Sequence, residues 1–305
     1  AAHRYPFAEW GWAAWALFAV LGWRSLIGLR ERAGFELALA HLAWLWAWVV
    51  AAGLTLFRLA RLSTQDDTAA FGSGWNATAL LLPLLAMAAL CLWRPAIAGR
   101  PVAQRFGQWS GLAMASFMVV LVATLALTLL TPANPYPLMW IPLLNPLSLM
   151  QWAALLMLGF WLASPLVDAR LGRRRMPVLA AGGFVLVTTE VLRTAHFWGH
   201  VAWDASMFST SLVQTSLTVV WSALGVAGWI AGSRRGQRGL WLASAALMGI
   251  VLIKLVTVDR GHLGNLLGIA SFIAYGLLCL AVGYFAPAPP SRAEPDDSNS
   301  QESKA

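Results

Sequence analysis

One apolar segment of the chain ends in a run of ionisable side chains, where residues 189–204 read TEVLRTAHFWGHVAWD. A carboxylate and imidazoles at this spacing could exchange protons with a substrate, because histidine titrates near neutral pH. The i, i+4 spacing of His196 and His200 could also place two imidazoles on one metal ion. That spacing alone is a weak metal signature, and no HExxH motif accompanies it. We therefore assign no metal site and keep the two histidines as weak candidates.

A second group of polar residues follows in the next apolar segments. At 1.5 Å per residue, Glu190 and Lys254 both lie about 20 Å from the predicted cytoplasmic ends of their helices. A lysine at the centre of a membrane span costs about 2.5–3.5 kcal/mol on insertion scales. A carboxylate at equal depth would offset that cost. We therefore expect Lys254 or Arg193 to pair with Glu190.

These residues form one set of candidates for a functional site. The catalytic candidates are Glu190, His196, His200, Asp259 and His262. The structural or ion-pairing candidates are Arg193, Lys254, Gln214 and Trp221. If the helix continues past residue 196, Glu190, Arg193, His196, His200 and Asp204 share an arc of about 120°. A polar face of this kind avoids lipid, so we expect it to meet other helices or water.

Composition identifies the elements that must position these side chains. Hydrophobic residues make up 59% of the chain and charged residues 11%, whereas soluble domains carry about 25% charged residues. The apolar blocks are about 18–20 residues long and do not alternate, so they suit membrane-spanning helices rather than barrel strands. The sequence predicts an all-α polytopic membrane protein with about nine transmembrane helices, at 7–23, 35–57, 76–93, 109–130, 147–167, 177–196, 210–232, 239–258 and 266–286.

Basic residues in the connecting segments predict the orientation. One set of connections carries thirteen Lys and Arg residues and the opposite set carries six. The positive-inside rule puts the richer set on the cytoplasmic side of a bacterial inner membrane. The N-terminus would then be periplasmic and the C-terminus cytoplasmic. The net charge of +8 thus reports topology, and the expected partner is the lipid bilayer and not nucleic acid. We expect residues 1–286 to be a transmembrane domain, which could be the C-terminal part of a longer protein. We expect residues 287–305 to be a disordered cytoplasmic tail.

The connection at residues 131–146 differs from all the others. It reads TPANPYPLMWIPLLNP, with five prolines and no charge. The prolines rule out a continuous helix. Non-helical backbone survives at membrane depth only where protein or a water-filled cavity shields it. The segment is therefore either the wall or lid of an outward-facing cavity, or a connector on the bilayer surface with Tyr136 and Trp140 among the headgroups.

Two stretches resemble a large bacterial family catalogued only as predicted membrane proteins. The first is YPLMWIPLLNPLSLMQ (136–151), and the second runs from TTEVLRTAHFWG to the end of the last span. The residues that match the family pattern are Glu190, Arg193, His196, Trp221, Lys254, Asp259, Ser271 and Phe272. The chain departs from the pattern at Ser148, where the family has Asp, and at Gly268, where it has Arg. The resemblance covers residues 136–286 and implies a helical membrane fold, but it implies no reaction.

Three functions stay open at this point. The first is a transporter or scaffold, in which the polar residues between spans six to eight either fix helix packing as a satisfied network or couple protons or ions. The second is an enzyme that modifies an envelope lipid or glycan at the periplasmic leaflet. The third is a subunit that binds upstream transmembrane segments or other membrane subunits. The sequence does not identify a cofactor.

Overall fold

The computed structural model describes residues 6–7, 9–31, 34–64 and 73–257, together with residues 269, 273, 275–277 and 279–280. Seven of the described helices are long and apolar enough to cross a membrane, and Pro146–Leu162 is a shorter apolar helix. The prediction of an all-α polytopic membrane protein is therefore confirmed. The ninth predicted span, 266–286, lies largely outside the described residues.

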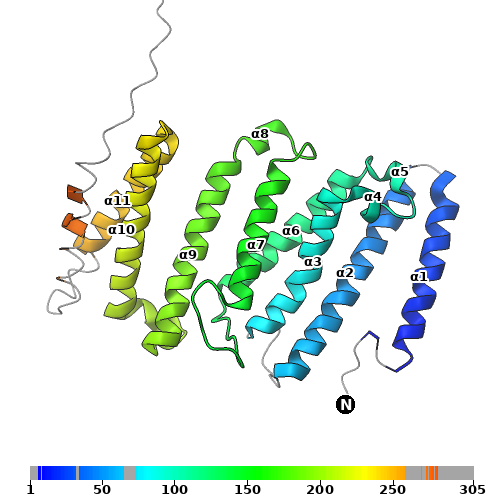
Figure 1. The fold of residues 1–305 in the computed structure, drawn as a ribbon, viewed down its shortest axis with the longest axis horizontal. Helices are drawn as coiled ribbons and strands as arrows, with labels where there is room; N and C mark the ends of the chain where they lie inside the picture. The colour runs from blue at the N-terminus through cyan, green and yellow to red at the C-terminus, as the bar shows by residue number, and fades with distance from the viewer. Residues whose placement is uncertain are drawn as a thin grey trace, which may run out of the picture. The chain divides into compact units, whose positions relative to one another are not determined.

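The helices form two compact units, 1–197 and 198–305, which are described separately. Unit 1 contains the long helices α1 (Gly11–Gly28), α2 (Gly34–Thr64), α3 (Gly74–Trp93), α6 (Ser110–Leu129), α7 (Pro146–Leu162) and most of α9 (Arg175–Gly199). Its short elements are η1 (Leu29–Glu31), α4 (Pro95–Ala98), α5 (Ala103–Phe106) and α8 (Ala169–Gly172). Helix α3 packs against α2, α6 and α7, and Figure 1 shows α2 and α3 side by side.

Three spans differ clearly from their predicted bounds. Helix α1 runs over Gly11–Gly28 instead of 7–23, and Glu9 precedes it with a φ of 50°. Helix α2 ends at Thr64 instead of residue 57, and α7 ends at Leu162 instead of residue 167. The end of α7 has a local cause, since Pro165 lacks the N–H that would continue the helical hydrogen bonds. Helix α7 is consequently only 17 residues long, or about 26 Å.

Leucine side chains pack over glycines between α7 and α9. A Cβ atom built on Gly182 would lie 2.6 Å from Leu155 Cδ1, and one on Gly159 would lie 2.9 Å from Leu179 Cδ1. A side chain at either glycine would displace the leucine that covers it. These contacts hold the N-terminal half of α9 beside the C-terminal half of α7.

One end of unit 1 gathers the C-terminal ends of α2 and α6 and the N-terminal ends of α3 and α7. The proline-rich loop, residues 130–145 between α6 and α7, lies at this end. It is joined to the start of α3 by a hydrogen bond from Gly74 N to Asn134 O of 2.9 Å. We call this end the loop face.

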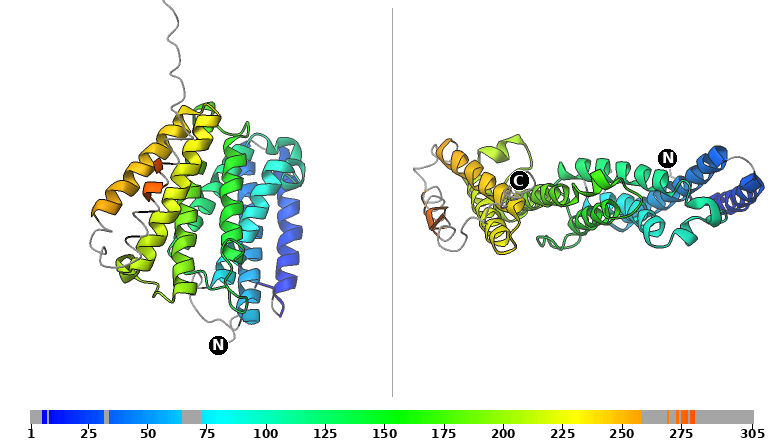
Figure 2. Two further views of the ribbon diagram at one scale, coloured as in Figure 1. Left: turned by 60° about the vertical axis from the view of Figure 1, so that its left-hand side comes forward. Right: turned by 90° about the horizontal axis from the view of Figure 1, so that it is seen from above.

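Unit 2 contains η2 (Ala205–Ser209), α10 (Ser211–Arg234) and α11 (Arg238–Thr257). Helices α10 and α11 run side by side, as Figures 1 and 2 show. Their contact is close because α10 presents glycines. A Cβ atom on Gly232 would lie 2.6 Å from the backbone nitrogen of Trp241, and one on Gly228 would lie 2.4 Å from Ser244 Oγ.

Candidate functional site

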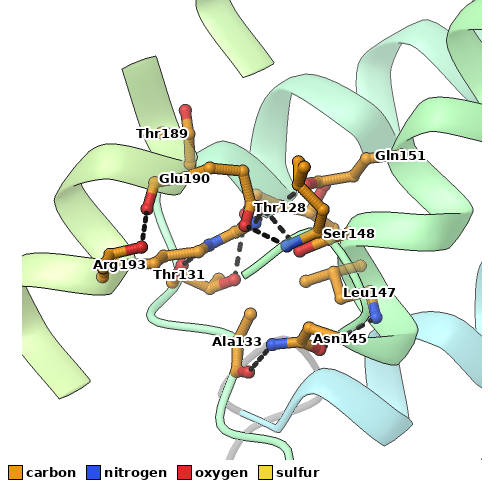
Figure 3. A network of polar contacts seen from close by, with 12 residues as sticks. Thr128, Thr131, Ala133, Asn145, Leu147, Ser148, Gln151, Thr189, Glu190 and Arg193 are labelled. Carbon is orange, nitrogen blue, oxygen red and sulfur yellow. Dashed lines mark hydrogen bonds and ion pairs between the residues drawn. The ribbon is translucent and has the colours of Figure 1, made fainter. Parts of the chain in front are cut away.

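A buried network of polar groups surrounds Arg193 in the C-terminal half of α9 (Figure 3). The Arg193 side chain is fully buried. Its Nη1 atom donates to Glu190 Oε1 at 3.1 Å and to Gln151 Oε1 at 2.8 Å. Its Nη2 atom donates to Thr128 O at 2.9 Å, and its Nε atom donates to Thr131 O at 3.2 Å. The guanidinium therefore ties together α9, α7, the end of α6 and the first residues of the proline-rich loop.

Glu190 completes the network one turn earlier on α9. Its Oε1 atom also accepts a hydrogen bond of 2.5 Å from Ser148 Oγ on α7. Its Oε2 atom accepts one of 3.3 Å from the backbone N–H of Leu143. Both carboxylate oxygens thus bind groups of the protein, and the side chain is buried. Pairing with Arg193 and these two donors offset the cost of holding the charge away from water.

The contacts of α9 reach both ends of the proline-rich loop. Arg193 binds the carbonyl of Thr131 at the start of the loop, and Glu190 binds the N–H of Leu143 near its end. Leu143 has a φ of 65° and Ala133 a φ of 60°. This left-handed conformation costs a residue with a side chain roughly 1–2 kcal/mol, and it persists only where surrounding contacts impose it. The α9 pair supplies one of those contacts.

Further hydrogen bonds hold the first half of the loop. Asn145 Nδ2 donates to Ala133 O at 2.9 Å, while Asn145 Oδ1 accepts from Leu147 N and caps α7. Trp75 Nε1 on α3 donates to Pro135 O at 3.0 Å. These contacts bridge the two ends of the loop and join it to α3 and α7.

Trp140 anchors the middle of the loop. It is 5% exposed and stacks on Phe197 of α9, with ring centroids 4.5 Å apart and an interplanar angle of 15°. Tyr136, in contrast, is exposed. The sequence placed both rings among the headgroups, whereas the structure turns Trp140 inward against α9.

The network also fixes how deeply the loop enters unit 1. Glu190 lies nine residues before Gly199, the last residue of α9, which is about 13 Å along the helix axis. Because Leu143 N–H reaches Glu190, this part of the loop lies well inside the end of α9. The backbone groups bonded at that depth have protein partners, as non-helical backbone requires inside a membrane.

The predicted polar face of five residues is shorter in the structure. Helix α9 ends at Gly199, and His200 follows with a φ of 51°. Asp204 is extended and caps η2 through Ser206. The expectation that His200 and Asp204 continue the face of Glu190 is therefore wrong, since a left-handed residue at 200 breaks the helical phase. Gly199 is a recognisable helix-stop signal that could have shown this.

The remaining ionisable residues of the stretch 189–204 differ in burial and in contacts. His196 is half-buried and packs edge-to-face on Phe197 at 4.8 Å. His200 is exposed. The hydroxyl and the backbone N–H of Ser206 both donate to Asp204, and these bonds hold the pKa of that carboxyl below its usual range. Within the described residues, no group of three His, Cys, Asp or Glu side chains could hold a metal ion.

Lys254 on α11 donates hydrogen bonds to α10. Its Nζ atom donates to Gln214 O at 3.0 Å and to Thr218 Oγ1 at 2.7 Å, both on α10. The contribution of Gln214 is thus its backbone carbonyl, while its side chain donates to Phe208 O. Trp221 is half-buried one turn further along α10.

Several predicted residues cannot be placed, and several unpredicted ones are central. Asp259, His262, Ser271, Phe272 and Gly268 lie outside the described residues. The predicted pairing of Glu190 with Arg193 is confirmed, and the further hydrogen-bond partners of the two side chains come from α6, the loop and α7. The partners that sequence reasoning missed are Thr128, Thr131, Leu143, Ser148 and Gln151. The available signal was the uncharged polar pair Ser148 and Gln151 in the apolar fifth span.

Comparison with known proteins agrees with this architecture. A family model described as predicted membrane protein (DUF2339) matches residues 1–289. No curated protein and no solved structure matches the chain. The family match extends the resemblance noted at residues 136–286 over almost the whole sequence. The chain therefore belongs to the DUF2339 family of predicted membrane proteins.

Proposed function

We propose that this protein is a membrane-embedded scaffold in which the Glu190–Arg193 pair fixes the proline-rich loop within the helical domain. The observation that carries the proposal is the set of partners of Arg193. Three of its four recorded acceptors are the carbonyls of Thr128 and Thr131 and the carboxylate of Glu190. These partners join α6, the loop and α9, so the charged pair acts as a brace between segments far apart in sequence.

The burial of the pair favours this role over catalysis. A general acid or base must reach the proton of a substrate, whereas Glu190 is buried and its oxygens accept from Arg193, Ser148 and Leu143. An enzyme acting on an envelope lipid or glycan would need this carboxylate to be released first. A structural role requires a polar network in which the buried groups are hydrogen-bonded to one another.

We also propose that the loop face is extracytoplasmic. The basic clusters of unit 1 flank the opposite helix ends, at residues 24–31, 94–105 and 170–175. The positive-inside rule would put those ends on the cytoplasmic side of a bacterial inner membrane. The loop would then be presented on the periplasmic side.

A second candidate function is ion coupling in a carrier, favoured by Lys254. An ammonium group within a transmembrane helix pair is a functional candidate by default, and here it donates to Gln214 O and Thr218 Oγ1. Lys254→Met distinguishes this role from the scaffold. If the protein is a carrier, the variant should lose the ion-dependent uptake that the wild type shows in proteoliposomes, while its loop stays protected from hydrogen exchange. If the protein is a scaffold, neither the wild type nor the variant should show such uptake.

Hydrogen–deuterium exchange of the protein in nanodiscs tests the scaffold directly. We expect Arg193→Met to raise exchange in residues 138–145 at least tenfold and to leave α10–α11 unchanged. Val185→Ala is the control on the same helix, because the Val185 side chain is exposed more than one turn before Glu190, and it should leave loop exchange at the wild-type level. Unchanged loop exchange in Arg193→Met would refute the bracing role.

A further inference from the structure

The outward side of the proline-rich loop is apolar. Three of its exposed side chains lie between the buried residues Pro135 and Trp140, one follows Trp140 directly, and two more lie shortly before α7. We call this set the apolar rim, consisting of Tyr136, Leu138, Met139, Ile141, Leu143 and Leu144. Met139 is 84% exposed, and residues 131–146 contain no charged side chain.

The rim is mounted on a backbone that is held from behind. Trp75, Asn145 and the Glu190–Arg193 pair bind the loop on its inner side. Trp140, between Met139 and Ile141, is packed against Phe197. The rim residues therefore cannot turn inward to cover their apolar surface without breaking these contacts. An apolar surface that is fixed and uncovered marks an interaction site.

The depth of the loop indicates what covers the rim. Leu143 is bonded to Glu190, about 13 Å inside the end of α9. Helix α7, which begins directly after the loop, is about 26 Å long, shorter than the roughly 30 Å hydrocarbon core. The start of α7, and the loop before it, therefore lie at or within the edge of the hydrocarbon region.

We infer that the apolar rim is a lipid-inserting element, in contact with phospholipid acyl chains of one leaflet. The absence of charge suits this depth, because a charged side chain there would be costly. Tyr136 suits the leaflet boundary, where aromatic rings with a polar end accumulate. The brace formed by Glu190 and Arg193 then has a further consequence, since it holds this element at a fixed depth. The fixed depth of the rim rests on the proposed scaffold, whereas its contact with lipid is tested separately.

Site-directed labelling tests the inference in nanodiscs of phosphatidylcholine. Met139→Cys in a Cys279→Ala background is labelled with an environment-sensitive fluorophore, because Cys91 is buried while Cys279 is exposed. Lipids with a spin label near the headgroup end of the acyl chain should quench this probe at least threefold more than aqueous iodide does. Leu156→Cys, exposed in the middle of α7, is the lipid control, and Ala169→Cys, exposed beside Asp168 in α8, is the water control.

Two outcomes would overturn the lipid contact. Quenching by iodide but not by lipid would place the rim in water. Protection from both quenchers would mean that protein, either a second copy or another subunit, covers it. The scaffold fails separately: if Met139→Cys reports lipid equally well with and without Arg193→Met, the rim inserts without the brace.

Discussion

Removing the guanidinium of Arg193 should destabilise the protein strongly. Arg193→Met substitutes an unbranched apolar side chain for the charged one. The Glu190 carboxylate is then buried without its cation. Breaking a buried ion pair by removing one partner costs about 3–5 kcal/mol. The recorded acceptors Thr128 O, Thr131 O and Gln151 Oε1 also lose their donors, so we expect the loss of unfolding free energy to lie within or above that range.

The buried thiol of Cys91 supplies the assay. Cys91 is 2% exposed in α3, so a thiol-reactive dye reports unfolding once exposed Cys279 is replaced by alanine. Titration with a denaturing detergent in mixed micelles gives the unfolding free energy of each variant. Arg174→Met is the matched control, because Arg174 is exposed next to the start of α9, and surface changes usually stay within about 0.5 kcal/mol.

A double variant isolates the charge pair from the rest of the network. Arg193→Met combined with Glu190→Met removes both charges, and exchanging a buried ion pair for apolar residues is often neutral or stabilising. The double variant should therefore be more stable than Arg193→Met alone. A loss below about 1 kcal/mol for Arg193→Met, or strictly additive effects in the double variant, would refute the view that these side chains brace the loop as a pair.

Two further changes test separate contacts. Ser148→Ala removes the donor to Glu190 Oε1, and a buried hydrogen bond to a charged group should be worth about 1.5–3 kcal/mol in the same titration; a loss below about 0.5 kcal/mol would contradict the recorded bond. Gly232→Ala would bring a Cβ to 2.6 Å from Trp241 N and should cost about 1–3 kcal/mol by overpacking, seen as a lower melting temperature. Gly249→Ala, with nothing within 4 Å of its Cβ, should instead stabilise α11 by about 0.4–1 kcal/mol; equal effects of the two glycine changes would argue against close α10–α11 packing.

The sequence by itself determined the solvent and the secondary structure of this protein. Long apolar blocks and scarce charge are local properties, and lipid permits few backbone conformations other than helix. Prolines at residues 131–146 likewise identified the segment that cannot be helical. The end of α7 at Leu162 was less well predicted, because the apolar block continues past the point where Pro165 ends the helix.

The tertiary structure decided which side chains Glu190 and Arg193 bind. The depth argument made Lys254 and Arg193 equally good partners for Glu190, since depth is only one of three coordinates. The structure records the ion pair with Arg193 at 3.1 Å. The other partners are uncharged, with Ser148 and Gln151 42 residues away and Thr128 O 65 residues away. Serine, threonine and backbone carbonyls give no charge signal in a sequence, so only the packing of α6, α7 and α9 could reveal them.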